Sequence, residues 1–137
     1  MLTVDGPDAE AALLDWVRAW FDLLAAGRLT EACARLDEPA GSGAAWTPAA
    51  LAGAVAAAFG PETRFAAAHP EGPRFTSPHT AAGRERCDVG AFADGTGFWL
   101  DCDVPLNGAF GDLTAQFEFR WRAPRTLAAR LYDLHVL

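Results

Sequence analysis

The spacing of apolar residues changes once along the chain, from a helical period to a period of two. In residues 9–26, apolar side chains such as Trp16, Val17 and Trp20 recur on one stripe, which is typical of a helix with one buried face. From residue 84 onward, apolar and polar residues alternate, which indicates half-buried β-strands. Helices followed by antiparallel strands predict an α+β fold.

Capping signals define the ends of the helices. Asp8 is a typical N-cap and Gly27 a typical C-terminal glycine. Thr47 followed by Pro48 is a strong helix start, because threonine caps the free N–H groups and proline fits the first turn. The sequence therefore predicts three helices, over residues 8–26, 28–36 and 47–59.

Four longer strand candidates form an antiparallel meander, and a fifth short strand is expected around residues 74–77. The four cover residues 84–93, 96–106, 113–123 and 126–137. Asp94–Gly95 is typical of a two-residue hairpin turn. Counting back from this turn pairs Cys87 with Cys102 and places Trp99 over Gly90.

The strands have one polar face, and two aspartates of the segment FWLDCDVPLNG lie on it. The alternation predicts that this face carries Arg86, Asp88, Asp101, Asp103, Glu118, Arg120 and Arg122. Carboxylates beside arginines stay ionised and make poor general acids, so a solvated lattice of ion pairs is the first interpretation. The alternative is a partner-binding or homodimer face anchored by Trp99. Its residues would be Trp99, Asp101, Asp103, Arg120 and Arg122.

The segments WVRAWFDLLAAGRLTEACARL and LYDLHVL, together with the strands before the latter, give the chain a pattern that resembles the NTF2-like superfamily. That superfamily includes ketosteroid isomerases and SnoaL-type cyclases. The resemblance implies one domain over residues 1–137, with three N-terminal helices packed on a strongly curved antiparallel sheet. The segment DEPAGSGAAWTP predicts only loop, where such folds usually place a short strand. Because the superfamily holds enzymes, ligand binders, dimerisation modules and toxin-immunity proteins, fold alone does not choose a function.

Asp133 and His135 are the candidate catalytic residues. They are two apart in the last strand, so the carboxylate could orient the imidazole as an acid–base pair. If Leu127 and Leu131 face the core, both side chains follow them to one rim of the cone, and Tyr132 faces the other way. The alternative is a histidine that is only structural. Isomerase-like members use an aspartate inside an apolar pocket, whereas the inward positions of the two best strands here are apolar.

Aromatic residues and cysteines occupy the apolar faces. Five aromatic residues either line a ligand pocket or form the core, and core is the more common role at these spacings; they are Trp16, Trp20, Phe117, Phe119 and Trp121. Cys87 and Cys102 are expected to be neighbours on the helix-facing side and to stay reduced. The two-residue turn would make them a hydrogen-bonded pair with β-carbons about 5.5 Å apart, against about 3.8 Å in a disulfide.

The net charge and the lack of known motifs argue against several classes of function. The net charge of −7 argues against nucleic acid and favours either solubility or a basic protein partner. No cysteine or histidine spacing suits a metal, no motif suits a cofactor, and no apolar run is long enough to span a membrane. The absence of a signal peptide predicts a cytoplasmic protein.

Two hypotheses follow for the function. The first is a non-enzymatic domain that binds a protein partner or a small apolar ligand, for example an immunity-type protein that blocks a basic toxin. The second is an enzyme that acts on a small apolar substrate with His135 and Asp133.

Overall fold

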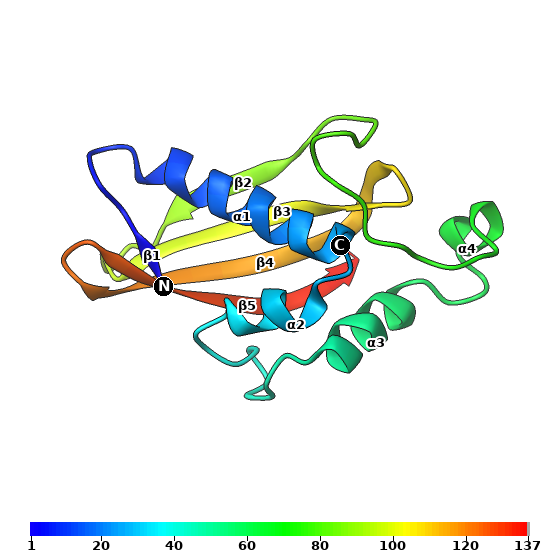
Figure 1. Ribbon diagram of the computed structural model, residues 1–137, viewed down its shortest axis with the longest axis horizontal. Helices are drawn as coiled ribbons and strands as arrows, with labels where there is room; N and C mark the ends of the chain where they lie inside the picture. Colours follow the sequence, from blue (N-terminus) through cyan, green and yellow to red (C-terminus); the bar gives the residue numbers. More distant parts are fainter. Residues whose placement is uncertain (137) are drawn as a thin grey trace.

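Four helices and a five-stranded antiparallel sheet make up the computed structural model, which describes residues 1–136 (Figure 1). The helices are α1 (Ala9–Ala25), α2 (Leu29–Ala34), α3 (Pro48–Ala58) and α4 (Arg64–Ala68). The strands are β1 (Leu2–Thr3), β2 (Cys87–Ala91), β3 (Gly97–Leu106), β4 (Ala109–Ala123) and β5 (Thr126–Val136). They lie in the order β1-β5-β4-β3-β2.

The predicted α+β class with a strongly curved antiparallel sheet is confirmed. The sequence pattern missed β1 and α4, which are too short to show a period. In place of the short strand expected around residues 74–77, Phe75 forms an isolated bridge to Leu106. Leu137, at the end of the last expected strand, lies outside the described residues. Among residues 1–136, no helix combines the length and the apolar character needed to cross a lipid bilayer.

The helix ends follow from the capping residues. The Asp8 carboxylate accepts a hydrogen bond from the Ala11 N–H at 3.1 Å, and the Thr47 hydroxyl accepts one from the Ala50 N–H at 3.0 Å. Each contact satisfies an N–H that the helix itself leaves free. Gly27, just after α1, has φ +76°, a conformation that glycine adopts without steric cost.

Helix α1 lies across one face of the sheet (Figure 1), and we call this the inner face. The Trp16 ring packs edge-on against Phe119, with ring centroids 5.2 Å apart, and Trp20 packs edge-on against Phe117 at 5.5 Å. The Trp20 indole N–H donates to the Ala32 carbonyl at 2.9 Å, so its polar atom is satisfied although the side chain is fully buried. The opposite face of the sheet, turned away from α1, is called the outer face below.

The predicted register of the first hairpin is confirmed. Cys87 pairs with Cys102, Val89 with Leu100, and Gly90 with Trp99. Both cysteines line a small space with Leu14 and Val17 of α1, so they lie on the inner face as expected.

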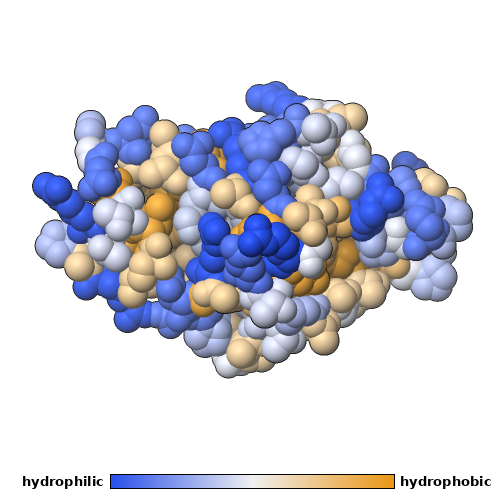
Figure 2. Space-filling view, viewed as in Figure 1, coloured by the Kyte–Doolittle hydropathy of each residue, from blue (hydrophilic) through white to orange (hydrophobic). Residues whose placement is uncertain are grey.

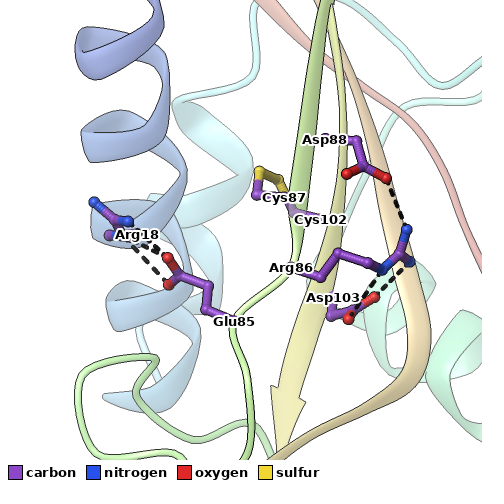
Figure 3. The surroundings of a disulfide bond; sticks show 7 residues. All are labelled: Arg18, Glu85, Arg86, Cys87, Asp88, Cys102 and Asp103. Atoms are coloured by element: carbon purple, nitrogen blue, oxygen red, sulfur yellow. Dashed lines mark hydrogen bonds and ion pairs between the residues drawn. A yellow bond between two sulfur atoms is a disulfide. The ribbon is translucent and has the colours of Figure 1, made fainter.

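The prediction that these cysteines stay reduced is wrong, because a disulfide joins them (Figure 3). The reason lies in the turn: the hairpin closes on the hydrogen-bonded pair Phe92 and Gly97, whose N–H···O distance is 2.9 Å, so its loop has four residues instead of two. Hydrogen-bonded and non-hydrogen-bonded pairs alternate along the ladder. The longer loop therefore moves the cysteines to a non-hydrogen-bonded pair, in which the Cα atoms lie only 4.0 Å apart.

Strand β5 changes face at a β-bulge. Phe117 pairs with Leu131 and Gln116 pairs with Asp133, so Tyr132 is an extra residue with no partner on β4. A single inserted residue reverses which side chains face the core. The expected orientation is therefore wrong: Leu127 and Leu131 are buried on the inner face, but Asp133 and His135 do not follow them.

Unfolding without a reductant should expose one reactive thiol per chain, that of Cys33. Burial raises the pKa of the Cys33 thiol, so the titration is done in denaturant, where this thiol is fully accessible. After reduction, three thiols per chain should react. The variant Cys33→Ser should show no reactive thiol before reduction. Three thiols in the unreduced wild-type chain would contradict the disulfide.

Candidate functional site

An open groove of about 370 Å³ lies on the outer face of the sheet. Trp99 and Tyr132, two of its lining residues, are 37% and 45% exposed, and large exposed aromatic side chains on a sheet face are typical of binding surfaces. The groove is lined by Phe92, Trp99, Asp101, Gln116, Phe117, Glu118 and Tyr132.

Trp99 lies flat across β2 because its cross-strand partner is Gly90. A Cβ atom added to Gly90 would overlap the indole ring. Glycine is thus required for a close approach of the ring to the strand backbone. This contact holds Trp99 as one aromatic side of the groove.

Tyr132 reaches the groove because it follows the inward-facing Leu131 in β5 and so faces the outer side of the sheet. The β-bulge changes the faces of the residues that come after it. The loop between α2 and α3 supports its ring: a Cβ added to Gly41 would lie 2.6 Å from it, and the Gly41 N–H donates to the Tyr132 carbonyl at 2.9 Å. The period of two places Tyr132 on the face opposite to Leu131, where the structure has it. Tyr132 was not predicted as a site residue because separate strands together form the groove, and no local pattern shows this.

Most charges of the outer face are already paired. The Arg86 guanidinium donates to Asp103 at 2.7 Å and to Asp88 at 2.9 Å (Figure 3). The hydrogen bond to Asp103 is the main cause that raises the pKa of Arg86. Asp103 is therefore ion-paired, as the sequence analysis expected.

The other predicted arginines also have partners. Arg120 stacks over the Phe92 ring at 3.7 Å from its centroid and donates to Glu118 at 3.2 Å. Arg122, an extra residue at a second bulge, pairs with Glu38 in the loop between α2 and α3. These pairings engage the arginines with carboxylates other than Asp101.

Asp101 is the exception. It is half-buried in the groove, and within residues 1–136 no basic side chain lies within ion-pair distance of its carboxylate. The expected lattice of ion pairs therefore includes Asp103 and Glu118 but not Asp101. A partly desolvated carboxylate without a partner can gain free energy from a cation supplied by a ligand.

The candidate catalytic residues lie close to each other but beside the groove rather than in it. His135 Nδ1 is 3.2 Å from Asp133 Oδ2, without the geometry of a hydrogen bond. His135 pairs across the strands with Thr114, whose buried hydroxyl has no hydrogen-bond partner among the described residues. Neither His135 nor Asp133 is among the residues that line the groove.

The five aromatic candidates for a ligand pocket pack against each other and their neighbours. Trp20, Phe117 and Phe119 are at most 1% exposed, and Trp16 covers both phenylalanine rings. Trp121 is partly buried and packs edge-on against Phe98 at 6.0 Å. These side chains fill the space between α1 and the sheet.

A second cavity, of about 340 Å³, opens between the end of α1 and α3. Figure 2 shows an apolar area in this hollow on the α1 side of the molecule. Its walls include Leu24, Val55, Phe75 and Leu106, and Arg74 lies at its edge without an ion-pair partner within residues 1–136. Sequence reasoning missed this cavity because four separate segments form it.

The part of the chain that the structure describes has no group of three or more histidine, cysteine, aspartate or glutamate residues that could hold a metal ion. No family model, curated protein or solved structure matches the chain.

Substituting Gly90 by alanine should displace the Trp99 indole into water, because the new Cβ overlaps the ring and the ring can rotate away. We expect the Trp99 fluorescence, obtained by subtracting the spectrum of Trp99→Phe, to shift to longer wavelength. Gly53→Ala is the matched control, because a Cβ at Gly53 meets no atom within 4 Å. An unchanged Trp99 spectrum in Gly90→Ala would show that the ring does not lie on Gly90.

Proposed function

We propose that this chain is a non-enzymatic domain of the NTF2-like type that binds a basic protein partner through the groove on its outer sheet face. The observation that carries the proposal is the carboxylate of Asp101, unpaired within residues 1–136, in a groove that two exposed aromatic residues, Trp99 and Tyr132, also line. Aromatic anchors beside a complementary charge are common where protein interfaces gain most of their affinity.

The shape and charge of the groove support a protein partner. Small-molecule pockets enclose most of the ligand surface, whereas this groove is open along the sheet. The net charge of −7 would attract a basic surface and speed its association. An immunity-type protein that covers a basic toxin is one example of such a pair.

A second copy of the chain fits the groove less well. Within residues 1–136, the arginines of the outer face already contact carboxylates of the same chain, so a copy offers none of them unpaired to Asp101; they are Arg86, Arg120, Arg122 and Arg130. We therefore propose a different, basic protein as the partner rather than a homodimer through this face.

A small apolar ligand is the second candidate, and the cavity between α1 and α3 supports it. The walls of this cavity are mostly apolar, and the Arg74 guanidinium at its edge could pair with an acidic group of the ligand. An enzyme based on His135 and Asp133 has weaker support, because these residues line neither this cavity nor the groove.

Selection from a random peptide display library should enrich basic peptides, because they complement the unpaired carboxylate in the groove. We expect Trp99→Ala to weaken the selected peptides at least about tenfold, as for an interface anchor. Val136→Ala, which truncates another exposed apolar residue, is the control and should have no effect. Enrichment of neutral or acidic peptides, or full binding by Trp99→Ala, would contradict the proposal.

Titration with the apolar anion 1-anilinonaphthalene-8-sulfonate tests the second candidate. The fluorescence of the dye should rise on binding to the native protein, and Ala52→Trp should abolish the rise because Ala52 lines the cavity and the indole would fill it. Ala57→Trp adds the same ring to α3 at a position outside the lining residues and should leave the signal unchanged. Equal binding by both variants would exclude this cavity as the site.

A further inference from the structure

The structure points to a more specific chemistry for the partner, which rests on the function proposed above. We propose that Asp101, Trp99 and Tyr132 form a subsite for the guanidinium group of one arginine side chain of the partner. Three features carry this inference: the charge that is missing at Asp101, the aromatic sides of the groove, and an arginine that the protein itself binds nearby.

The missing charge is local. On the outer face, Asp103 and Asp88 share Arg86, and Glu118 contacts Arg120 and Arg130. Asp101 lines the groove and has no such partner within residues 1–136. A ligand cation at this point would pair this remaining carboxylate.

The sides of the subsite suit a planar cation. Trp99 is held across Gly90, and Tyr132 is held by the loop at Gly41, so both rings are fixed before the ligand arrives. A guanidinium group can stack on an aromatic ring and at the same time donate to a carboxylate. Gln116, opposite Asp101 on β4, adds an amide oxygen that can accept a further N–H.

The protein shows the same arrangement a few residues away. Arg120 lies over the Phe92 ring at 3.7 Å from its centroid and donates to the Glu118 carboxylate at 3.2 Å. Phe92 and Glu118 also line the groove. The groove therefore already holds one arginine between an aromatic ring and a carboxylate. Arg130, which contacts Glu118, lies 5.9 Å from the centroid of the Tyr132 ring. Within residues 1–136, by contrast, no cation lies over the Trp99 ring and none pairs with Asp101.

Arginine fits this subsite better than lysine. Its planar group offers two parallel N–H donors to a carboxylate and is weakly hydrated, so it loses less hydration energy when it stacks on a ring. The lysine ammonium is a compact, strongly hydrated charge that cannot stack in this way. The subsite should therefore discriminate between two side chains of the same charge.

NMR titration with single amino-acid probes tests this inference. N-acetyl-arginine amide should shift the Trp99 indole resonance in a saturable way and bind at least about fivefold more tightly than N-acetyl-lysine amide. The uncharged citrulline analogue should not saturate. Asp101→Asn should weaken the arginine probe at least about tenfold, whereas Asp112→Asn, a matched change at an exposed aspartate outside the groove, should not.

The outcomes separate this inference from the proposed function. Equal affinity for the arginine and lysine probes, or unchanged arginine binding by Asp101→Asn, would overturn the arginine subsite. If the selected basic peptides still require Trp99 in that case, the proposed function stands without the subsite. If the peptides require neither Trp99 nor Asp101, both proposals fail. The amide spectrum of each variant shows whether it is folded, and Asp101→Ser provides a second neutral variant should Asp101→Asn not fold.

Discussion

The packing of α1 against β4 is the interaction on which the rest of the structure depends. Trp16 and Trp20 lie edge-on against Phe117 and Phe119, and this contact fixes which side of the sheet becomes the core. Because side chains alternate along a strand, the choice also decides which residues face outward. The exposed position of Trp99 and the half-exposed position of Asp101 thus follow from the burial of their neighbour Leu100.

Two aromatic side chains border the groove on this outer face. Tyr132 faces outward from β5 because it follows the buried Leu131, and Gly90 leaves room for the Trp99 ring on β2. The arginines that could have neutralised Asp101 are held elsewhere: Arg86 by Asp103, Arg120 by Glu118, and Arg122 by Glu38. The groove therefore combines supported aromatic rings with the carboxylate of Asp101, which has no basic partner within residues 1–136. This combination is the basis of the proposed binding function.

The sequence predicted the features that depend on local periodicity and missed those that depend on one extra residue. The caps at Asp8 and Thr47 and the pairing of Cys87 with Cys102 follow from short-range patterns, and the structure confirms them. The loop after Phe92 is two residues longer than Asp94–Gly95 suggested. Cys87 and Cys102 are therefore a non-hydrogen-bonded pair instead of a hydrogen-bonded one, and their closer approach allows the disulfide. The bulge at Tyr132 leaves no clear signal in an alternating pattern, so the expected orientation of Asp133 and His135 was wrong. Tyr132 faces outward as the pattern predicts, but no local pattern shows that a groove forms there.

The location of a bound arginine side chain tests the central claim most directly. Intermolecular nuclear Overhauser effects between an isotope-labelled basic peptide and the protein would give this location. The account predicts contacts from the arginine side-chain protons to the rings of Trp99 and Tyr132, with the guanidinium beside Asp101. Contacts from an apolar side chain of the peptide to these rings, or a peptide bound on the α1 side of the molecule, would contradict it.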